Sequence, residues 1–375
     1  MRLARPQHPS PGPPTVVESR LTGSVRVVGA GLLGTSIGLG LVARGVDVIV
    51  ADASPTHVSI AVDYGAGRQA APDDRPSLIV VCVPPDVTAQ VVAAELEAFP
   101  HAVVADVASV KLSVLHELRA SGADVSRYIG THPMAGRERG GPLQGRADLF
   151  LGRPWVVAAH DGVSYQRGSV IDDLILDLGA TLVEMTPEAH DSSVALVSHV
   201  PQVVSTLMAK RLTDAPGAAV NLAGQGLRDV TRVAASDPGL WVQILGANAA
   251  PVAGILKAFR ADLDRVIETL DAPEAVGNRR RLAEELLGGN VGVARIPGKH
   301  GQDRRFAQLV VMVDDRPGEL ARLMSEIGEA GVNLEDLRLE HSPGAQIGLA
   351  EIAVVPEAVP GLTEWLGERG WRIAG

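Results

Sequence analysis

The chain has 375 residues, a formal net charge of −10, and 46% apolar against 21% charged residues. This composition is typical of a globular protein with a large core, and at about 150 residues per domain the length predicts two or three domains. The acidic balance argues against a nucleic-acid partner, and the single cysteine, Cys82, excludes an internal disulfide and a cysteine-based zinc site.

The composition also bears on where the protein is located in the cell. Residues 1–23 contain five prolines among small and polar residues, which predicts a disordered tail and not a secretory signal. No stretch approaches the roughly 20 uninterrupted apolar residues of a membrane span. We therefore expect a soluble cytoplasmic protein that binds no membrane, no nucleic acid and no metal.

Residues 24–186 alternate between β-branched apolar runs and segments with helical spacing. The predicted strands are Val25–Gly29, Val46–Asp52, Leu78–Val83, Ala102–Val107, Tyr128–His132 and Trp155–Ala159. Leu32–Arg44 and Val87–Glu97 are apolar at helical spacing. Apolar strands that alternate with helices predict an α/β domain whose parallel sheet is covered on both faces.

Residues 187–290 contain no convincing strand and predict a second, all-helical domain, with breaks near Pro216, Pro238 and Pro273. The Gly-rich, basic residues 291–305 predict a linker. Residues 306–375 predict a small third domain of the βαββα type, with strands at Phe306–Val313, Leu334–Leu339 and Gln346–Val354.

Gly29, Gly31 and Gly34 form a G-x-G-x-x-G motif, with Leu32 and Leu33 between the second and third glycines. The motif follows a predicted strand and opens a helix, the arrangement that binds the pyrophosphate of a dinucleotide. Asp52 ends the next strand, where a carboxylate accepts hydrogen bonds from ribose hydroxyls and repels a 2′-phosphate, so we expect NAD and not NADP. A Gly-rich surface turn without a ligand is the alternative. Val83 and Pro84 either flank the cofactor or simply end their strand.

Three further segments carry polar residues that a fold alone does not require: residues 106–111, 130–141 and 198–202. The first two follow strands, where ligands of open α/β sheets bind. His132 is the candidate general base, because imidazole titrates near neutrality; a hydrogen-bonded structural histidine is the alternative. His199 is either a ligand contact or a core histidine, and His190 is either functional or part of the polar start of a helix.

Two arginines follow a Gly-rich break in the helical region. Arg228 and Arg232 have the chemistry to bind a carboxylate in bidentate fashion. Two solvated arginines on a helix face are the alternative, and the pattern alone favours that reading slightly.

Taken in order, these segments resemble one family. GTHPMAGRERGG at residues 130–141, SHVPQ at 198–202 and GLRDVTRVAASDPGLW at 226–241 look like bacterial prephenate dehydrogenases, of the prephenate/arogenate dehydrogenase family. The resemblance covers about residues 24–290 and implies hydride transfer from prephenate to NAD with loss of CO2. The product would be 4-hydroxyphenylpyruvate, or tyrosine if arogenate is the substrate.

The resemblance also implies roles for individual residues. His132 would take the proton of the ring hydroxyl, with Ser109 orienting it near the nicotinamide. The other implied site residues are Arg232 for a substrate carboxylate, Glu138 at the cleft mouth, and His199 and Trp241 as walls of the pocket. Gln202 stands where many members have a second histidine, which leaves the choice between prephenate and arogenate open.

Residues 306–375 are similar to an ACT domain, a small regulatory module. The similarity implies an effector site near Asp315, Gly318 and Asn333, with tyrosine as the natural ligand; a dimerisation module without ligand is the alternative. Such domains and the long apolar helices together imply a homodimer. Two other classes remain as alternatives: a β-hydroxyacid dehydrogenase, which would need a catalytic lysine in the helical region, and an NAD-linked amino-acid sensor without activity.

Overall fold

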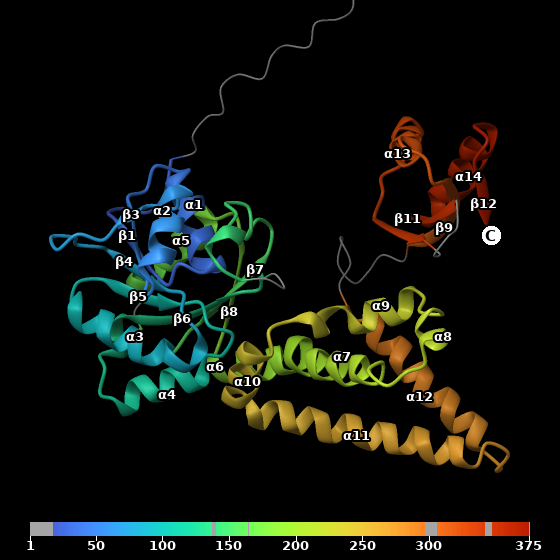
Figure 1. The fold of residues 1–375 in the computed structure, drawn as a ribbon, viewed down its shortest axis with the longest axis horizontal. Helices are drawn as coiled ribbons and strands as arrows, with labels where there is room; N and C mark the ends of the chain where they lie inside the picture. Colours follow the sequence, from blue (N-terminus) through green and yellow to red (C-terminus); the bar gives the residue numbers. More distant parts are fainter. Residues whose placement is uncertain (1–17, 137–139, 164, 297–305, 342–346, 375) are drawn as a thin grey trace, which may run out of the picture. The chain divides into compact units, whose positions relative to one another are not determined.

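The computed structural model, drawn as a ribbon in Figure 1, describes residues 18–374, apart from 137–139, 164, 297–305 and 342–346. The chain divides into two compact units. Unit 1 comprises residues 1–213 and 231–258, and unit 2 comprises residues 214–230 and 259–375. Each unit is described by itself.

Unit 1 is built on an eight-stranded sheet with the strand order β3-β2-β1-β4-β5-β6-β7-β8. The strands are β1 (Val25–Val28), β2 (Val48–Ala51), β3 (Arg68–Gln69), β4 (Leu78–Val81), β5 (Val103–Asp106), β6 (Tyr128–Pro133), β7 (Pro154–Ala158) and β8 (Thr181–Met185). Strands β1 to β6 are parallel. Their order is that of a Rossmann dinucleotide-binding sheet, so the predicted α/β class is confirmed.

The prediction of a wholly parallel sheet is wrong at β7, which runs antiparallel to β6 with Gly130 opposite Ala158. A parallel neighbour requires a crossover connection, usually a helix. Between β6 and β7 the described residues contain only the short 3₁₀ turn η2 (Pro142–Gln144). The chain therefore turns back beside β6, and α5 (Tyr165–Asp177) then leads to β8, which is parallel to β7.

Helices cover both faces of this sheet. One core layer joins β-strand residues such as Val27 and Val80 to α1 (Leu32–Val42) and α5. The opposite layer joins Ile79 and Val81 to α3 (Pro85–Ala98) and α4 (Leu112–Ala120), and α2 (Pro55–Asp63) packs beside β2 and β3. Successive residues of β4 thus point into different layers, which explains why its sequence is continuously apolar.

The N-terminal tail predicted over residues 1–23 is too long. Leu21 is buried in the core, and Asp177 at the end of α5 accepts hydrogen bonds from the Ser19 hydroxyl and from Arg20. These contacts hold residues 18–23 against the sheet domain, while residues 1–17 lie outside the described part.

The helical segment that follows β8 is long and carries one irregular turn. It consists of α6 (Pro187–Val194), the π-helical stretch η3 (Ala195–His199) and α7 (Val200–Lys210). Pro201 has no N–H and its ring clashes with the carbonyl four residues earlier. The wider π turn accommodates the proline without ending the helix, and π turns are frequent at functional sites.

Residues 187–210 are long and apolar enough to cross a membrane by length and composition. The bent pair α10 (Pro238–Ala247) and α11 (Ala249–Asp271) passes the same test only as one span bent by 95°. The first segment, however, buries His190, Asp191 and His199 in hydrogen bonds within unit 1. That is the behaviour of a core helix in a globular domain.

Unit 2 contains α8 (Gly217–Val220), α9 (Gln225–Thr231), most of α11, and α12 (Asn278–Val293), which runs into the predicted linker. Its C-terminal part has the order β9 (Ala307–Asp314), α13 (Glu319–Glu329), β10 (Asp336–His341), β11 (Ile347–Val354), η5 (Pro356–Ala358), α14 (Val359–Glu368) and β12 (Arg372–Ala374). The sheet order is β10-β11-β9-β12, all antiparallel. The predicted order βαββα lacks only the short β12, and this C-terminal part of unit 2 has the order βαββαβ.

Candidate active site

The glycine loop between β1 and α1 has the geometry of a phosphate-binding turn. Gly29 has φ +105°, and a Cβ there would lie 2.4 Å from the carbonyl oxygen of Cys82. A Cβ on Gly34 would lie 1.9 Å from the carbonyl oxygen of Gly29. At Gly31, by contrast, a Cβ would meet nothing within 4 Å. The first and third glycines therefore serve the fold, whereas the second faces open space.

These residues fit a dinucleotide. No side chain caps the N-terminus of α1 at Gly31, so the backbone N–H groups of Leu32 and Leu33 are available to a phosphate. Asp52 follows β2 and accepts hydrogen bonds from the N–H groups of Ala30 and Ser54 at 2.6 and 2.7 Å. An ionised carboxylate has further lone pairs for ribose hydroxyls. Val83 and Pro84 follow β4 at the same edge of the sheet, and Pro84 is the N-cap residue of α3.

A buried polar network lies at the ends of the neighbouring strands β5 and β6. Asp106 forms an ion pair with Lys111 and accepts hydrogen bonds from the Tyr128 hydroxyl at 2.6 Å and from the N–H of Ala108. The Lys111 ammonium also donates to the carbonyl of Thr131. Burial lowers the pKa of Lys111, and the nearby Asp106 opposes that shift. Sequence reasoning singled out this segment but did not find the pair.

His132 lies near the end of β6, directly after Thr131, and is buried. Its Nδ1 is 2.9 Å from Nε2 of His190 on α6, and His190 Nδ1 is 2.7 Å from Oδ1 of Asp191. Asp191 also accepts hydrogen bonds from the N–H groups of Lys111 and Leu112, both at 2.9 Å. Asp191 thus anchors α6 to the loop after β5, and His132 on β6 is hydrogen-bonded to His190 on α6.

The expected orienting contact from Ser109 to His132 is not present. In the described part of the chain Ser109 is half-buried and makes no hydrogen bond with His132, which His190 contacts instead. The sequence signal that could have found His190 is the adjacent acid, because a His-Asp pair at the start of a helix is a possible relay. Glu138, expected at the cleft mouth, lies outside the described residues.

His199 and Trp241 do lie together. The rings meet edge to face with centroids 5.9 Å apart, and Trp241 packs against the same core layer as Val83. Asn248 donates from Nδ2 to the carbonyl of Asp191 at 2.8 Å and to Nδ1 of His199 at 3.1 Å. Because a carbonyl only accepts, this amide orientation is determined, and neutral His199 must carry its proton on Nε2.

Gln202 and Arg232 differ in environment. Gln202 is buried on α7 and makes one long contact, 3.5 Å from Nε2 to the Thr206 hydroxyl. Arg232 begins the 3₁₀ turn η4 (Arg232–Ala235), which packs against α7, and its side chain is exposed. Among the described residues no carboxylate pairs with Arg232, so its guanidinium remains available to an anion.

The electrostatics keep both central histidines neutral. Burial lowers the pKa of His132 well below its usual value near 6.5, helped by His190, Lys111 and His199. Burial also lowers the pKa of His199 to about 4, although Asp191 opposes the shift. At neutral pH both rings therefore carry no charge, and His132 can accept a proton.

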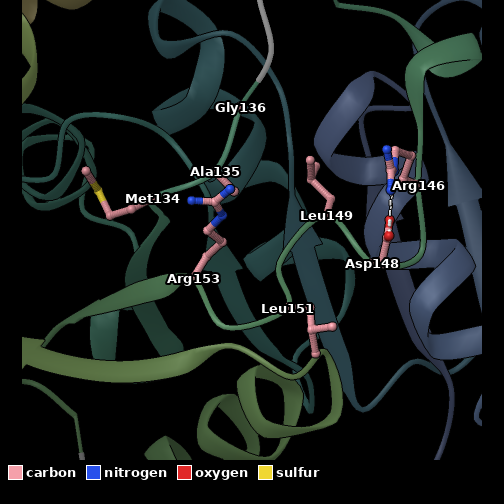
Figure 2. Close-up of a pocket in the computed structure, with 8 residues that line it drawn as sticks. All are labelled: Met134, Ala135, Gly136, Arg146, Asp148, Leu149, Leu151 and Arg153. Carbon is pink, nitrogen blue, oxygen red and sulfur yellow. Dashed lines mark hydrogen bonds and ion pairs between the residues drawn. The ribbon is translucent and has the colours of Figure 1, made fainter. Parts of the chain in front are cut away.

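A polar cavity of about 350 Å³ opens beside the segment that leaves β6 (Figure 2). It is lined by Met134, Ala135, Gly136, Arg146, Asp148, Leu149, Leu151 and Arg153. Arg146 is ion-paired with Asp148, and Arg153 extends toward Ala135 (Figure 2). None of the predicted catalytic residues lines it, although it begins two residues after His132 in sequence.

The residues predicted to bind an effector lie in unit 2. Gly318 has φ +94° and is the N-cap residue of α13, and Asp315 and Asn333 are exposed. Asn333 donates to Glu335 at 3.3 Å.

Comparison with known proteins agrees with this geometry. The family description "Prephenate dehydrogenase, nucleotide-binding domain" matches residues 37–184, and "Prephenate dehydrogenase, dimerization domain" matches residues 186–286. NovF of Streptomyces niveus, described as a probable prephenate dehydrogenase, is 37% identical over 353 residues, covering 92% of this chain and 98% of NovF.

Two solved structures share the fold. The arogenate dehydrogenase of Synechocystis is 26% identical with a TM-score of 0.61, over 72% of this chain and 99% of that chain. The A. aeolicus prephenate dehydrogenase, in complex with hydroxyphenyl propionate and NAD+, is 24% identical with a TM-score of 0.65, over 74% and 99%. The chain belongs to the prephenate dehydrogenase family and is an NAD-dependent dehydrogenase with a Rossmann domain followed by a helical dimerization domain.

Proposed function

We propose that this enzyme catalyses the oxidative decarboxylation of prephenate to 4-hydroxyphenylpyruvate in tyrosine biosynthesis, with His132 as the general base. The observation that carries the proposal is His132 itself. It is a neutral histidine at the carboxyl end of a Rossmann strand, held by a hydrogen bond at Nδ1. Bound NAD would accept the hydride from the hydroxyl-bearing ring carbon.

The protein's own task in this reaction is to position the substrate and hold one proton. The ring hydroxyl loses its proton to His132 as the carbon to which it is attached loses hydride. The carbon–carbon bond to the ring carboxylate then breaks, CO2 leaves, and the electron pair makes the ring aromatic. General-base assistance of this kind contributes about 10²–10⁴ in rate.

The remaining roles are also proposals. Arg232 would bind a substrate carboxylate, which its exposed and unpaired guanidinium supports. His199, presenting Nε2–H, and Trp241 would shape the pocket, Ser109 would lie near the nicotinamide, and Glu138 would adjust the polarity of the cleft mouth. Gly29, Gly31, Leu32, Leu33, Gly34, Asp52, Val83 and Pro84 would bind the cofactor.

Arogenate is the alternative substrate, and the environment of Gln202 is compatible with it. Gln202 is buried with a single long hydrogen bond, so its amide could pair with either a keto-carboxylate or an amino-carboxylate side chain. The similarity to an arogenate dehydrogenase of known structure keeps this alternative open.

The test is NADH formation measured with prephenate and, separately, with arogenate. We expect turnover with prephenate to exceed that with arogenate. His132→Asn should still bind NAD but lose most turnover, whereas His116→Asn, at an exposed position on α4, should change nothing. No NADH from either substrate would contradict the proposed activity, and an active His132→Asn variant would contradict the base assignment.

The C-terminal βαββαβ part of unit 2 would be an ACT-like regulatory domain. Its strand–turn–helix junction at Asp315 and Gly318, with Asn333, would bind tyrosine and reduce activity. Titration of the enzyme with tyrosine, following both heat of binding and NADH formation, tests this. Binding without inhibition, or neither, would contradict it.

A homodimer in the cytoplasm is the remaining proposal. Phe259, Leu263, Ile267 and Leu270 are exposed and lie along one face of α11, within the segment that matches a dimerization domain. An exposed apolar stripe of this kind favours burial against a second copy. Sedimentation of the full chain at several concentrations measures the assembly.

A further inference from the structure

Asp191 and His190 on α6 and His132 on β6 form a buried chain of hydrogen bonds. The two links are 2.7 Å, from His190 Nδ1 to Asp191 Oδ1, and 2.9 Å, from His132 Nδ1 to His190 Nε2. His190 is 0% exposed, so water does not compete for its nitrogens. The two histidines are 58 residues apart in sequence.

The position of each proton in this chain follows from Asp191. Its carboxylate accepts hydrogen bonds from two backbone N–H groups and from His190, which together hold the pKa of Asp191 below its usual value despite burial. An ionised carboxylate can only accept. His190 must therefore donate from Nδ1, and when neutral it has a lone pair on Nε2.

The position of the proton on His132 follows from that on His190. Because His190 Nε2 accepts, His132 Nδ1 must carry the proton and donate it. The ring then has its lone pair on Nε2, the nitrogen that has no hydrogen-bond partner among the described residues. A general base needs that lone pair directed at the substrate.

We propose that His190, oriented by Asp191, is a positioning residue for His132: it selects the tautomer with a free Nε2 and stabilises the proton that His132 takes up. The first half of this proposal concerns the protein alone, and the second half rests on the proposed function.

The reaction releases no proton overall, which suits hydrogen-bonded side chains that are buried away from solvent. The O–H bond of the substrate breaks as an N–H bond forms on His132 Nε2, and His190 Nε2 accepts a hydrogen bond from the resulting imidazolium. When CO2 leaves, the ring oxygen becomes a phenolate, which takes the proton back from His132. Substrate plus NAD+ thus gives product, CO2 and NADH without releasing a proton. The hydrogen-bonded side chains have only to hold the proton until the phenolate takes it back.

The titratable groups that act on His132 are His190 from α6, Lys111 from the loop before α4 and His199 from η3, and Asp191 of α6 acts through its hydrogen bond with His190. Three of these neighbours, His190, Lys111 and His199, disfavour a positive charge on His132. An acceptor at Nδ1 compensates, because hydrogen bonds to charged groups are about twice as strong as neutral ones.

The first test uses the enzyme without substitution. In protein labelled with ¹⁵N at histidine, assigned by comparison with His132→Asn, two-bond ¹H–¹⁵N correlations report which ring nitrogen is protonated. We expect His132 to be protonated on Nδ1 and bare on Nε2, and His190 to be protonated on Nδ1. The opposite tautomer of His132 would overturn the proposal, whether or not prephenate is the substrate.

The second test compares two substitutions at position 190. His190→Leu removes the acceptor, and His190→Gln restores one through its amide oxygen. We expect kcat to fall about 10- to 100-fold in His190→Leu with KM little changed, as for loss of a hydrogen bond to a charged group, and to recover most of that loss in His190→Gln. Equal losses in both variants, or a raised KM with normal kcat, would overturn the positioning role.

Failure of the proposed function gives a separate result. If no substrate yields NADH, kcat is undefined, but the histidine correlations still show whether His190 sets the tautomer of His132. Circular dichroism and NAD binding establish that each variant is folded; if His190→Leu does not fold, the tautomer in the unsubstituted enzyme and in His190→Gln decides the outcome.

Discussion

Lys111 and Asp106 form an ion pair whose side chains are 1% and 0% exposed. The Lys111 ammonium also donates to the carbonyl of Thr131 at 2.6 Å, the residue that precedes His132. The backbone N–H of the same lysine donates to Asp191. One residue thus joins the end of β5, the end of β6 and the start of the helical domain.

We predict that Lys111→Met destabilises the protein strongly. The substitution leaves the carboxylate of Asp106 buried without its cation, which typically costs about 3–5 kcal/mol. Urea unfolding followed by circular dichroism measures the change in free energy. Lys210→Met, at an exposed position at the end of α7, is the control and should lie within about 0.5 kcal/mol of the parent. A similar small effect at Lys111 would show that Asp106 is neutral or otherwise compensated.

Substitution of single glycines in the loop should distinguish a glycine needed for NAD binding from one needed for folding. Gly31→Ala should leave the free energy of unfolding nearly unchanged, because a Cβ there meets no atom within 4 Å. It should weaken NAD binding about tenfold or more, since the backbone can no longer approach the pyrophosphate closely. NADH fluorescence titration measures the affinity.

Gly29→Ala should behave in the opposite way and impair folding, because φ is +105° and the new Cβ would clash with the carbonyl of Cys82. Gly328→Ala, in α13 with open space around it, is the control for both. Unchanged NAD affinity in a folded Gly31→Ala variant would remove the second glycine from the phosphate site.

Arg232→Ala should raise KM for the substrate with a smaller effect on kcat. The exposed guanidinium would lose a charge-assisted contact with a carboxylate, which is worth about 10-fold or more in affinity. Steady-state kinetics at saturating NAD give both constants. Arg211→Ala, also exposed and close to the end of α7, should leave KM unchanged. Equal KM values for the two variants would count against the carboxylate role.

The activity should persist on the acid side of pH 6.5. Burial and its cationic neighbours hold the pKa of His132 well below that value, so the base stays unprotonated as the pH falls through 6.5. The profile of kcat/KM against pH should therefore have its acid limb below 6.5. A limb at or above 6.5 would mean that His132 is charged in the free enzyme.

Stability should decrease as the pH falls from 6.5 to 4. His199 has a folded-state pKa of about 4 against 6.5 when exposed, so in this window the unfolded chain binds the proton and the folded chain does not. The contribution reaches about 3 kcal/mol at the acid end. Unfolding free energies at pH 7, 6, 5 and about 4.5 measure the slope.

His199→Asn should flatten this dependence, leaving the part that belongs to His132, whereas His116→Asn at an exposed site should not. An unaltered slope in His199→Asn would place the pKa of His199 near its ordinary value.

The sequence was sufficient to predict the elements whose signals are local. The G-x-G-x-x-G motif, Asp52 at the next strand end and His132 at another are read from short patterns, because β-branched runs and glycine turns are determined by neighbouring residues. The same locality explains the failure at β7: apolar strands look alike in either direction, and direction depends on the path of the connection.

What the sequence by itself determined was therefore the Rossmann domain, the helical domain that follows it, and His132 as the candidate base. Only the tertiary structure decided that the described hydrogen-bond partner of His132 is His190 and not Ser109, and that Lys111 and Asp106 are paired. These contacts join side chains from different elements, and a hydrogen bond or a buried ion pair depends on a separation of about 3 Å that no residue pattern encodes. Burial then sets the charge of each group, because desolvation disfavours an ion wherever the fold leaves it without a partner.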